Sequence, residues 1–152
     1  MSDLNFAIVP MQPKDSVTLA SSLRDEDRRE IESAGINPVA GVDMSYTGGL
    51  GNMAAWLDGD LVACWGCGGV YMGSVGRPWF LTTPTIKRLP PTLVARIYRH
   101  EVEKMQQLFP RLENWVDATY ASAVRLLKMT GFTVDAPVAI GHGMYSRFWR
   151  EG

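Results

Sequence analysis

The sequence has few of the residues that form covalent or metal cross-links. Only two of its 152 residues are cysteine and only two are histidine, which excludes a disulfide framework and a four-cysteine zinc site. No apolar run approaches the ~20 residues that a membrane-spanning helix requires. The segment Met1–Asn5 has neither the basic part nor the apolar part of a secretion signal. We therefore expect a reduced, cytosolic-type soluble protein.

Charge of either sign is also scarce. Charged residues make up 20% of the chain, hydrophobic residues make up 46%, and the formal net charge is −1. This composition excludes intrinsic disorder, a collagen-like chain and a coiled coil. It gives no global attraction to nucleic acid or to an anionic membrane, so we expect neither as a partner. The length fits one domain, residues 1–152.

The short motifs of common hydrolases and nucleotide-binding proteins are missing. The sequence contains no Gly-x-Ser-x-Gly elbow, no His-Glu-x-x-His and no Walker-type Gly-Lys-Ser/Thr. His100 lies among charged residues of an expected helix, and His142 lies between two glycines. We interpret the first as a surface residue and the second as a turn residue. A Ser/His/Asp hydrolase therefore has no motif support.

The charges and glycines that are present are unevenly distributed. The segment 1–86 has 5 basic and 10 acidic residues, whereas 87–152 has 10 basic and 6 acidic residues, so the net charges are −5 and +4. Of the 15 glycines, 11 lie between Gly35 and Gly76. A glycine-rich, charge-poor and aromatic stretch is typical of hairpins with buried faces, and the flanking segments have helical patterns.

The N-terminal part predicts one strand and two helices. The apolar run Phe6–Val9 predicts a short strand. Pro13 is tolerated in the first turn of a helix and indicates the first helix start, and Ser22 indicates a second. The charge-dense run Arg24–Glu32 is typical of a solvated helix face, and Gly35 ends it.

The middle of the chain predicts three strands. Asp58-Gly59 separates two strand-like runs, Asn52–Leu57 and Asp60–Trp65. This dipeptide is a strong hairpin signal, because a type I′ turn needs positive φ at both central positions. Trp79–Thr83 is the third strand, and Pro84 ends it because proline cannot donate to a ladder.

The C-terminal part predicts two helices that alternate with short strands. An apolar stripe with helical spacing lies between the Pro90-Pro91 pair and Pro110; its members are Ala95, Tyr98, Val102, Met105 and Phe109. A second helix is expected at Tyr120–Met129, with Gly131-Phe132 as a Schellman ending. Strands are expected at Asn114–Ala118, Phe132–Val134 and Met144–Trp149. The resulting order, β-α-α-β-β-β-α-β-α-β-β, is that of a mixed α/β (α+β) layer fold.

Cys64 and Cys67 form a Cys-x-x-Cys pattern without the context of a redox or zinc site. A redox motif needs its first cysteine at a helix N-terminus, but the glycine-rich segment 68–71 that follows is not helical in pattern. Zinc would need two further ligands. We interpret both cysteines as buried and structural.

The junction Thr85–Thr92 is a candidate phosphate site. It leads from a strand to the N-terminus of an amphipathic helix, where free N–H groups and the helix dipole attract anions. Lys87 and Arg88 add positive charge. The pair Pro90-Pro91 offers no N–H group, so an exposed basic connector is the alternative interpretation.

Several stretches resemble the GNAT family, the acetyl-CoA-dependent N-acetyltransferases. The segment Ile8–Asp15 is similar to the family's opening strand and first helix, and Ala123–Phe132 is similar to its late helix that ends in Gly-Phe. Leu112–Ala118 precedes that helix as the family's strand does. The resemblance implies a mixed central sheet of about six or seven strands with helices on both faces.

A narrower resemblance is to a phage family related to internal virion protein A of short-tailed phages, which is described as acetyltransferase-like. Three stretches carry it, Trp79–Thr82, Phe109–Asp117 and Gly131-Phe132. It implies a bacteriophage protein in the host cytoplasm or associated with the virion. Other phage virion proteins or host proteins would then be partners.

The GNAT resemblance implies a cofactor site for acetyl-CoA and no metal. The cofactor would lie in a gap between the strand around Phe80–Thr83 and the strand around Trp115–Asp117, and its pantetheine would pair like an added strand. The implied cofactor residues are the main chain of Leu81, Thr82 and Thr83 and, for the phosphates, Lys87, Arg88 and Thr92.

The resemblance also implies direct attack of an amine on the thioester, with Asp117 and Tyr120 as acid/base candidates. Asp117 has an ordinary alternative role as a cap of the following helix, and Tyr120 one in packing. Two positions depart from the family pattern. The loop at 87–91 lacks the family's glycines, and Leu127 stands where the family often has a tyrosine.

The expected function is transfer of an acetyl group from acetyl-CoA to an amine acceptor. The alternative is a non-catalytic virion, assembly or host-interaction protein on a degenerate GNAT scaffold. Aromatic residues of the glycine-rich region would supply an interaction face in that case, although core packing is the other use for them. These residues are Trp56, Trp65, Tyr71 and Trp79.

Overall fold

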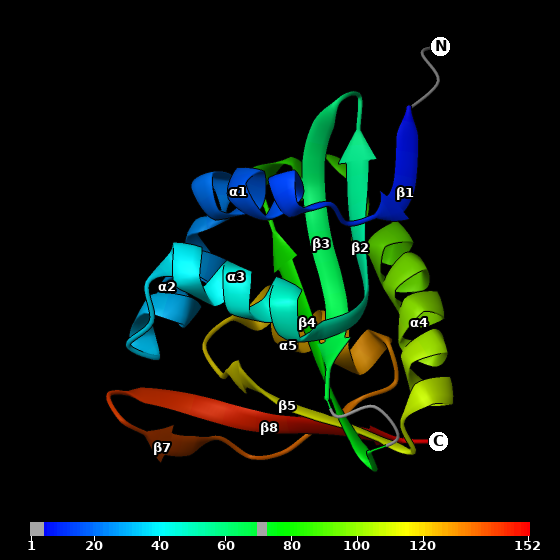
Figure 1. The fold of residues 1–152 in the computed structure, drawn as a ribbon. Helices are drawn as coiled ribbons and strands as arrows, with labels where there is room; N and C mark the ends of the chain where they lie inside the picture. The colour runs from blue at the N-terminus through cyan, green and yellow to red at the C-terminus, as the bar shows by residue number, and fades with distance from the viewer. Residues whose placement is uncertain (1–4, 70–72) are drawn as a thin grey trace. The chain divides into compact units, whose positions relative to one another are not determined.

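The computed structural model describes residues 5–69 and 73–152. This part of the chain forms five α-helices, one 3-10 helix (η1) and eight strands (Figure 1). The order is β1 Phe6–Pro10, α1 Pro13–Ser22, α2 Asp25–Ser33, α3 Pro38–Gly48, β2 Gly49–Leu57, β3 Asp60–Gly68, β4 Val75–Thr82, η1 Pro84–Arg88, α4 Pro91–Leu108, β5 Arg111–Asp117, α5 Ala121–Met129, β6 Thr133–Val134, β7 Val138–Ile140 and β8 Gly143–Glu151.

The strands confirm the mixed α/β class. They follow the order β1-β2-β3-β4-β5-β8-β6, and β7 pairs with β8 beside this path. The ladder between β4 and β5 is parallel, whereas β1–β2, β2–β3 and the ladders to β8 are antiparallel. No helix in the described residues is both long and apolar enough to cross a bilayer.

The chain divides into two compact units. Unit 1 comprises Met1–Gly68 and Trp79–Leu89, and unit 2 comprises Gly69–Pro78 and Pro90–Gly152. Strand β4 therefore passes from unit 2 into unit 1 after Pro78. The single domain expected from the length stays a prediction.

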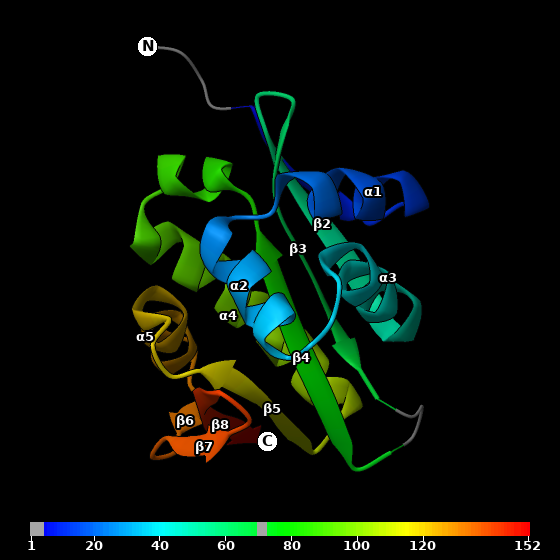
Figure 2. The ribbon, with the colours of Figure 1, turned by 90° about the vertical axis from the view of Figure 1, so that its left-hand side faces the viewer.

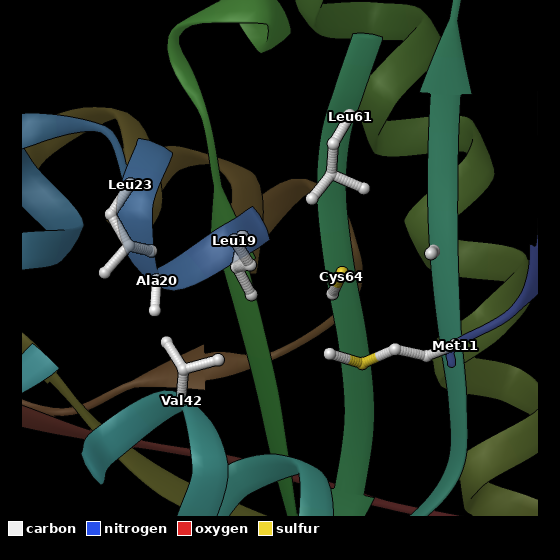
Figure 3. Close-up of a cluster of buried hydrophobic side chains, with 8 residues drawn as sticks. Met11, Leu19, Ala20, Leu23, Val42, Leu61 and Cys64 are labelled. Carbon is white, nitrogen blue, oxygen red and sulfur yellow. The ribbon is translucent and has the colours of Figure 1, made fainter. Parts of the chain in front are cut away.

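Unit 1 is built around the hairpin of β2 and β3. The turn between these strands has φ 50° at Asp58 and φ 85° at Gly59, which confirms the predicted hairpin. Helices α1 and α3 lie against one face of β2 and β3 (Figure 2). Their buried side chains meet those of the strands in one cluster (Figure 3): Met11, Leu19, Ala20, Leu23, Val42, Ala54, Leu61 and Cys64.

Helix α3 was not predicted, because its segment belongs to the glycine-rich stretch that was expected to form hairpins. The Asn37 side chain accepts a hydrogen bond of 2.9 Å from the Val39 N–H, and Pro38 occupies the first helical position. Asparagine followed by proline is a strong helix start. Val42 is fully buried, and this burial stabilises a helix that contains glycine.

Helix α2 differs from its prediction at two points. It begins at Asp25, because Ser22 is the last residue of α1. Its charged side chains are exposed or half-buried as expected, with one exception: the Asp27 side chain lies in the interior, and the residue is 4% exposed. The prediction of a uniformly solvated charged face is therefore wrong at Asp27.

Unit 2 pairs β5 with β8 and packs α4 and α5 onto this sheet. All five residues of the predicted apolar stripe of α4 are buried. After α5 the Phe132 N–H donates to the Leu127 carbonyl (3.0 Å) and the Gly131 N–H to the Lys128 carbonyl (3.2 Å). These bonds confirm the Schellman ending. Strand β7 is an unpredicted addition, and His142 lies in the turn between β7 and β8, as expected.

Both cysteines are buried thiols of unit 1. Neither forms a disulfide, and no group of three or more metal-ligating side chains occurs within the described ranges. Burial, with a smaller contribution from the negative charge of Asp15, raises the pKa of the Cys64 thiol to about 12. A thiol that stays protonated is a poor nucleophile. The expectation that both cysteines are buried is confirmed, and their structural role stays a prediction.

Gly131→Ala should lower the free energy of unfolding by about 1–2 kcal/mol, because φ at this position is +95° and an L-residue is strained there. A Cβ would also lie 3.1 Å from the Nε of Arg150. Urea denaturation measures the change. Gly48→Ala is the matched control, since a Cβ there meets no atom within 4 Å; equal losses for both variants would contradict this account.

Cys64 and Cys67 should resist a thiol reagent in the folded protein. At about pH 8 we expect labelling to be at least a thousandfold slower, as an order of magnitude, than in concentrated urea, because reaction requires unfolding. The rate of thiol release from a chromogenic disulfide provides the measurement. Rapid labelling of one thiol in the native protein would instead indicate an accessible, activated cysteine.

Candidate cofactor site

The parallel ladder between β4 and β5 is short. It consists of two residue pairs, Val75 with Arg111 and Gly76 with Leu112. Pro78 follows on β4 and has no N–H group to continue it. The Pro78 carbonyl instead accepts a hydrogen bond of 3.0 Å from the side-chain Nδ2 of Asn114. A side-chain amide thus takes the place of a main-chain bond at this point of unit 2.

In unit 1 the end of β4 carries the predicted pantetheine residues Leu81, Thr82 and Thr83. Thr83 faces β3, because its N–H donates to the Val62 carbonyl (2.9 Å) and its Oγ1 donates to the Leu61 carbonyl (2.6 Å). Successive residues of a strand direct their main-chain groups to opposite edges. The N–H and C=O of Thr82 therefore point to the edge away from β3.

This edge of Thr82 is bonded to the first turn of α2, which lies beside the end of β4 (Figure 2). The Thr82 N–H donates to Oδ2 of Asp27 (2.8 Å), and the Thr82 Oγ1 donates to the same oxygen (2.5 Å). The Thr82 carbonyl accepts from the Arg24 N–H (2.8 Å). Thr82 and Asp27 are each 4% exposed. In this conformation the predicted pantetheine edge does not fit the cofactor, because the chain's own groups already use it.

The predicted phosphate residues Lys87 and Arg88 lie in η1, and both are exposed. The Arg88 guanidinium approaches the hairpin turn of unit 1, with Nη2 3.0 Å from Asp58 Oδ2 and Nη1 3.6 Å from Asp60 Oδ2. For Lys87, by contrast, no carboxylate lies within ion-pair distance among residues 5–69 and 73–152. Lys87 is thus the cation of this segment that the fold leaves available.

The N-terminus of α4, in unit 2, offers one main-chain donor. Pro90 and Pro91 have no N–H groups, and the N–H groups of Leu93 and Val94 both donate to the Pro90 carbonyl. The exposed Thr92 has no main-chain acceptor for its N–H in the described part of the chain. The N-terminus of α4 by itself therefore offers one amide to an anion.

Asp117 and Tyr120 both lie just before the start of α5 in unit 2. Asp117 Oδ1 accepts hydrogen bonds from the N–H (2.9 Å) and the Oγ1 (2.7 Å) of Thr119. The Tyr120 N–H donates to the Asp117 carbonyl (3.0 Å), and the residue is 9% exposed. The Asp117 carboxylate thus stabilises the turn before α5, the ordinary role that the sequence allowed.

The aromatic residues of the glycine-rich region pack mainly into the interior. Trp65 is 2% exposed and stacks at a tilt on Phe80, with 5.8 Å between ring centroids. Trp56 and Trp79 are partly buried against the hydrophobic cluster of unit 1. Tyr71 lies outside the described residues. Core packing is therefore the main role of Trp56, Trp65 and Trp79, the three tryptophans of this region.

Sequence reasoning missed Arg24 and Asp27, the two residues that bind the edge of Thr82. Both lie in the charge-dense run that predicted a solvated helix face. No sequence signal marks them, because their partner is 55 residues away from Asp27. The expected gap between residues 80–83 and 115–117 stays a prediction.

Comparisons with known proteins give the fold but no sequence family. No protein-family model matches the chain, and no curated protein matches its sequence. The phage resemblance therefore stays a prediction.

Solved structures of GNAT-family acetyltransferases are similar over nearly the whole chain. The aminoglycoside acetyltransferase AAC(6')-Ib in complex with ribostamycin and coenzyme A is 15% identical, with a TM-score of 0.69 over 96% of this chain and 93% of that one. A GNAT-family acetyltransferase from Streptococcus pneumoniae is 14% identical, with a TM-score of 0.65 over 97% and 99%. One from Bacillus anthracis is 13% identical, with a TM-score of 0.65 over 96% and 94%. The chain has the GNAT acetyltransferase fold.

Proposed function

We propose that the protein binds acetyl-CoA and transfers its acetyl group to an amine acceptor. The observation that carries the proposal is the fold itself. It is similar, over 96% of the chain, to the fold of an aminoglycoside acetyltransferase that holds coenzyme A. Another structure of that acetyltransferase holds acetyl-CoA. The bound cofactor would supply the activated thioester.

The phosphates of the cofactor would bind at the segment 87–92. Lys87 supplies a cation without an ion-pair partner in the described residues, and Thr92 supplies an N–H without a main-chain acceptor. Arg88 adds a second cation whose exposed ion pairs with Asp58 and Asp60 are weak and exchangeable. Of the predicted pantetheine residues, Thr82 presents its main-chain groups to the edge away from β3 and would orient the pantetheine arm once it is released from α2, whereas the N–H of Thr83 is bonded to Val62.

Asp117 and Tyr120 remain the proposed acid/base groups. An amine acceptor must lose a proton to attack a thioester, and the leaving thiolate must gain one. The Asp117 carboxylate lies directly before α5, where its Oδ1 accepts two hydrogen bonds from Thr119. A carboxylate or phenol within reach of the amine typically contributes 10²–10⁴-fold to the rate.

A second candidate function is a non-catalytic scaffold, including a virion, assembly or host-interaction role in a phage. The observations that favour it are the bonds from α2 to Thr82 and the prolines that replace glycines at 90–91. Both changes remove main-chain groups from cofactor binding.

Lys87→Ala should weaken acetyl-CoA binding about tenfold, because a hydrogen bond to a charged group contributes about 1.5–3 kcal/mol. The thermal unfolding midpoint with and without millimolar acetyl-CoA measures this, since a ligand that binds only the folded state raises it. Lys14→Ala is the matched control, an exposed lysine on α1 outside the proposed site. If acetyl-CoA does not shift the midpoint of the unaltered protein, the scaffold function replaces this proposal.

Asp117→Asn should separate the acid/base role of Asp117 from its turn role. The asparagine oxygen can still accept from Thr119, so the midpoint of unfolding should change by less than about 2 °C. If the carboxylate accepts the proton of the amine, kcat falls at least about 10²-fold. Steady-state release of CoA thiol measures kcat, with Thr119→Val as the control that weakens the turn and keeps the carboxylate. Unchanged kcat would leave Asp117 a purely structural role.

A further inference from the structure

The bonds among Arg24, Asp27 and Thr82, here called the α2 latch, hold the first turn of α2 on the end of β4. We propose that the α2 latch is an autoinhibitory contact that closes the cofactor edge of β4 and must open before acyl-CoA binds. This inference rests on the function proposed above. It adds that the free protein is held in a state of low cofactor affinity.

The latch bonds the groups that an added strand would need. A ligand that extends a sheet exchanges N–H and C=O bonds with one residue of the edge. On β4 the last residue that faces this edge is Thr82, because Thr83 faces β3; Phe80 precedes it on the same edge, and the Pro78 carbonyl before that is bonded to Asn114. The latch satisfies both main-chain groups of Thr82 and its hydroxyl. The Thr82 N–H cannot donate fully to two acceptors, so the latch excludes a ligand that pairs with Thr82.

The chemistry of the latch favours the closed state. Its acceptor is a carboxylate, and hydrogen bonds to ionised groups are about twice as strong as neutral ones. Asp27 is buried in the interior, so opening would remove two hydrogen-bond donors from its carboxyl group unless water replaces them. Leu23, the residue before the latch, is 4% exposed and anchors the connection from α1.

The first turn of α2 also has local support that would survive opening. Arg24 Nε lies 2.8 Å from Glu26 Oε2, and Asp25, Glu26 and Asp27 place negative charge at the positive end of the helix dipole. Release therefore requires a small displacement of an intact turn. Such a two-state contact lowers the apparent affinity for a ligand by the fraction of molecules that are open.

The latch is tested by removing its carboxylate and measuring acetyl-CoA binding by calorimetry. Asp27→Ala removes both bonds to Oδ2, and Thr82→Val removes the hydroxyl donor only. The matched control is Asp25→Ala, which removes a carboxylate from the same helical turn at an exposed position. We expect about tenfold tighter binding for Asp27→Ala, a smaller gain for Thr82→Val and no change for the control.

Amide hydrogen exchange adds a readout that does not depend on turnover. In the unaltered protein the Arg24 N–H, bonded to the Thr82 carbonyl, should be protected without ligand and lose protection when acetyl-CoA is added. In Asp27→Ala it should be unprotected from the start. If Asp27→Ala fails to fold, Thr82→Val and the exchange measurement on the unaltered protein still test whether the latch limits acetyl-CoA binding.

Three outcomes are distinguishable. Tighter binding by the latch variants with loss of Arg24 protection on ligand binding supports the latch. Equal acetyl-CoA affinity in all variants, with Arg24 protected in the saturated protein, overturns the latch and leaves the acetyltransferase function intact. If no variant binds acetyl-CoA at millimolar concentration, both the latch and the acetyltransferase function are overturned, because releasing Thr82 would then not create a cofactor site.

Discussion

A buried carboxylate that joins two distant parts of the sequence is the constraint on which unit 1 depends at the end of β4. Asp27 carries a carboxyl group into an interior where an unpaired polar group would be costly. The N–H and the hydroxyl of Thr82 offset that cost, and they do so only if α2 lies against the last residue of the strand. The position of α2 is therefore set by these polar groups together with Ile31, the one large apolar side chain of this highly charged helix, which packs against the hydrophobic cluster of unit 1.

Sequence rules predicted the elements that are determined by interactions between residues close together in the chain. The positive φ of Asp58 and Gly59, the Schellman ending at Gly131 and the apolar stripe of α4 each follow from a few neighbouring residues. Helix α3 could have been predicted from Asn37-Pro38, but the surrounding glycines favoured strands. The start of α2 was displaced because Ser22 is a good capping residue that lies inside the last turn of α1.

The candidate site was predictable only in part, because its chemistry depends on long-range contacts. A basic junction before an amphipathic helix identified Lys87 and Thr92 without any knowledge of the fold. The same rule could not show that Arg88 turns back to Asp58, 30 residues earlier. It also could not show that α2 reaches Thr82. A run of charged residues predicts exposure on average. Asp27 is the buried exception in this run, and its contact with Thr82 is what positions the first turn of α2.

Strand β4 belongs to both compact units, and this has a consequence for biogenesis. Unit 1 is discontinuous in sequence, since its first 68 residues are completed by residues 79–89. During synthesis the hairpin of β2 and β3 emerges early, but the Thr82 groups that bond Asp27 in the folded chain leave the ribosome exit tunnel 55 residues after Asp27. The contact between α2 and the end of β4 therefore forms only after the whole of β4 has been synthesised.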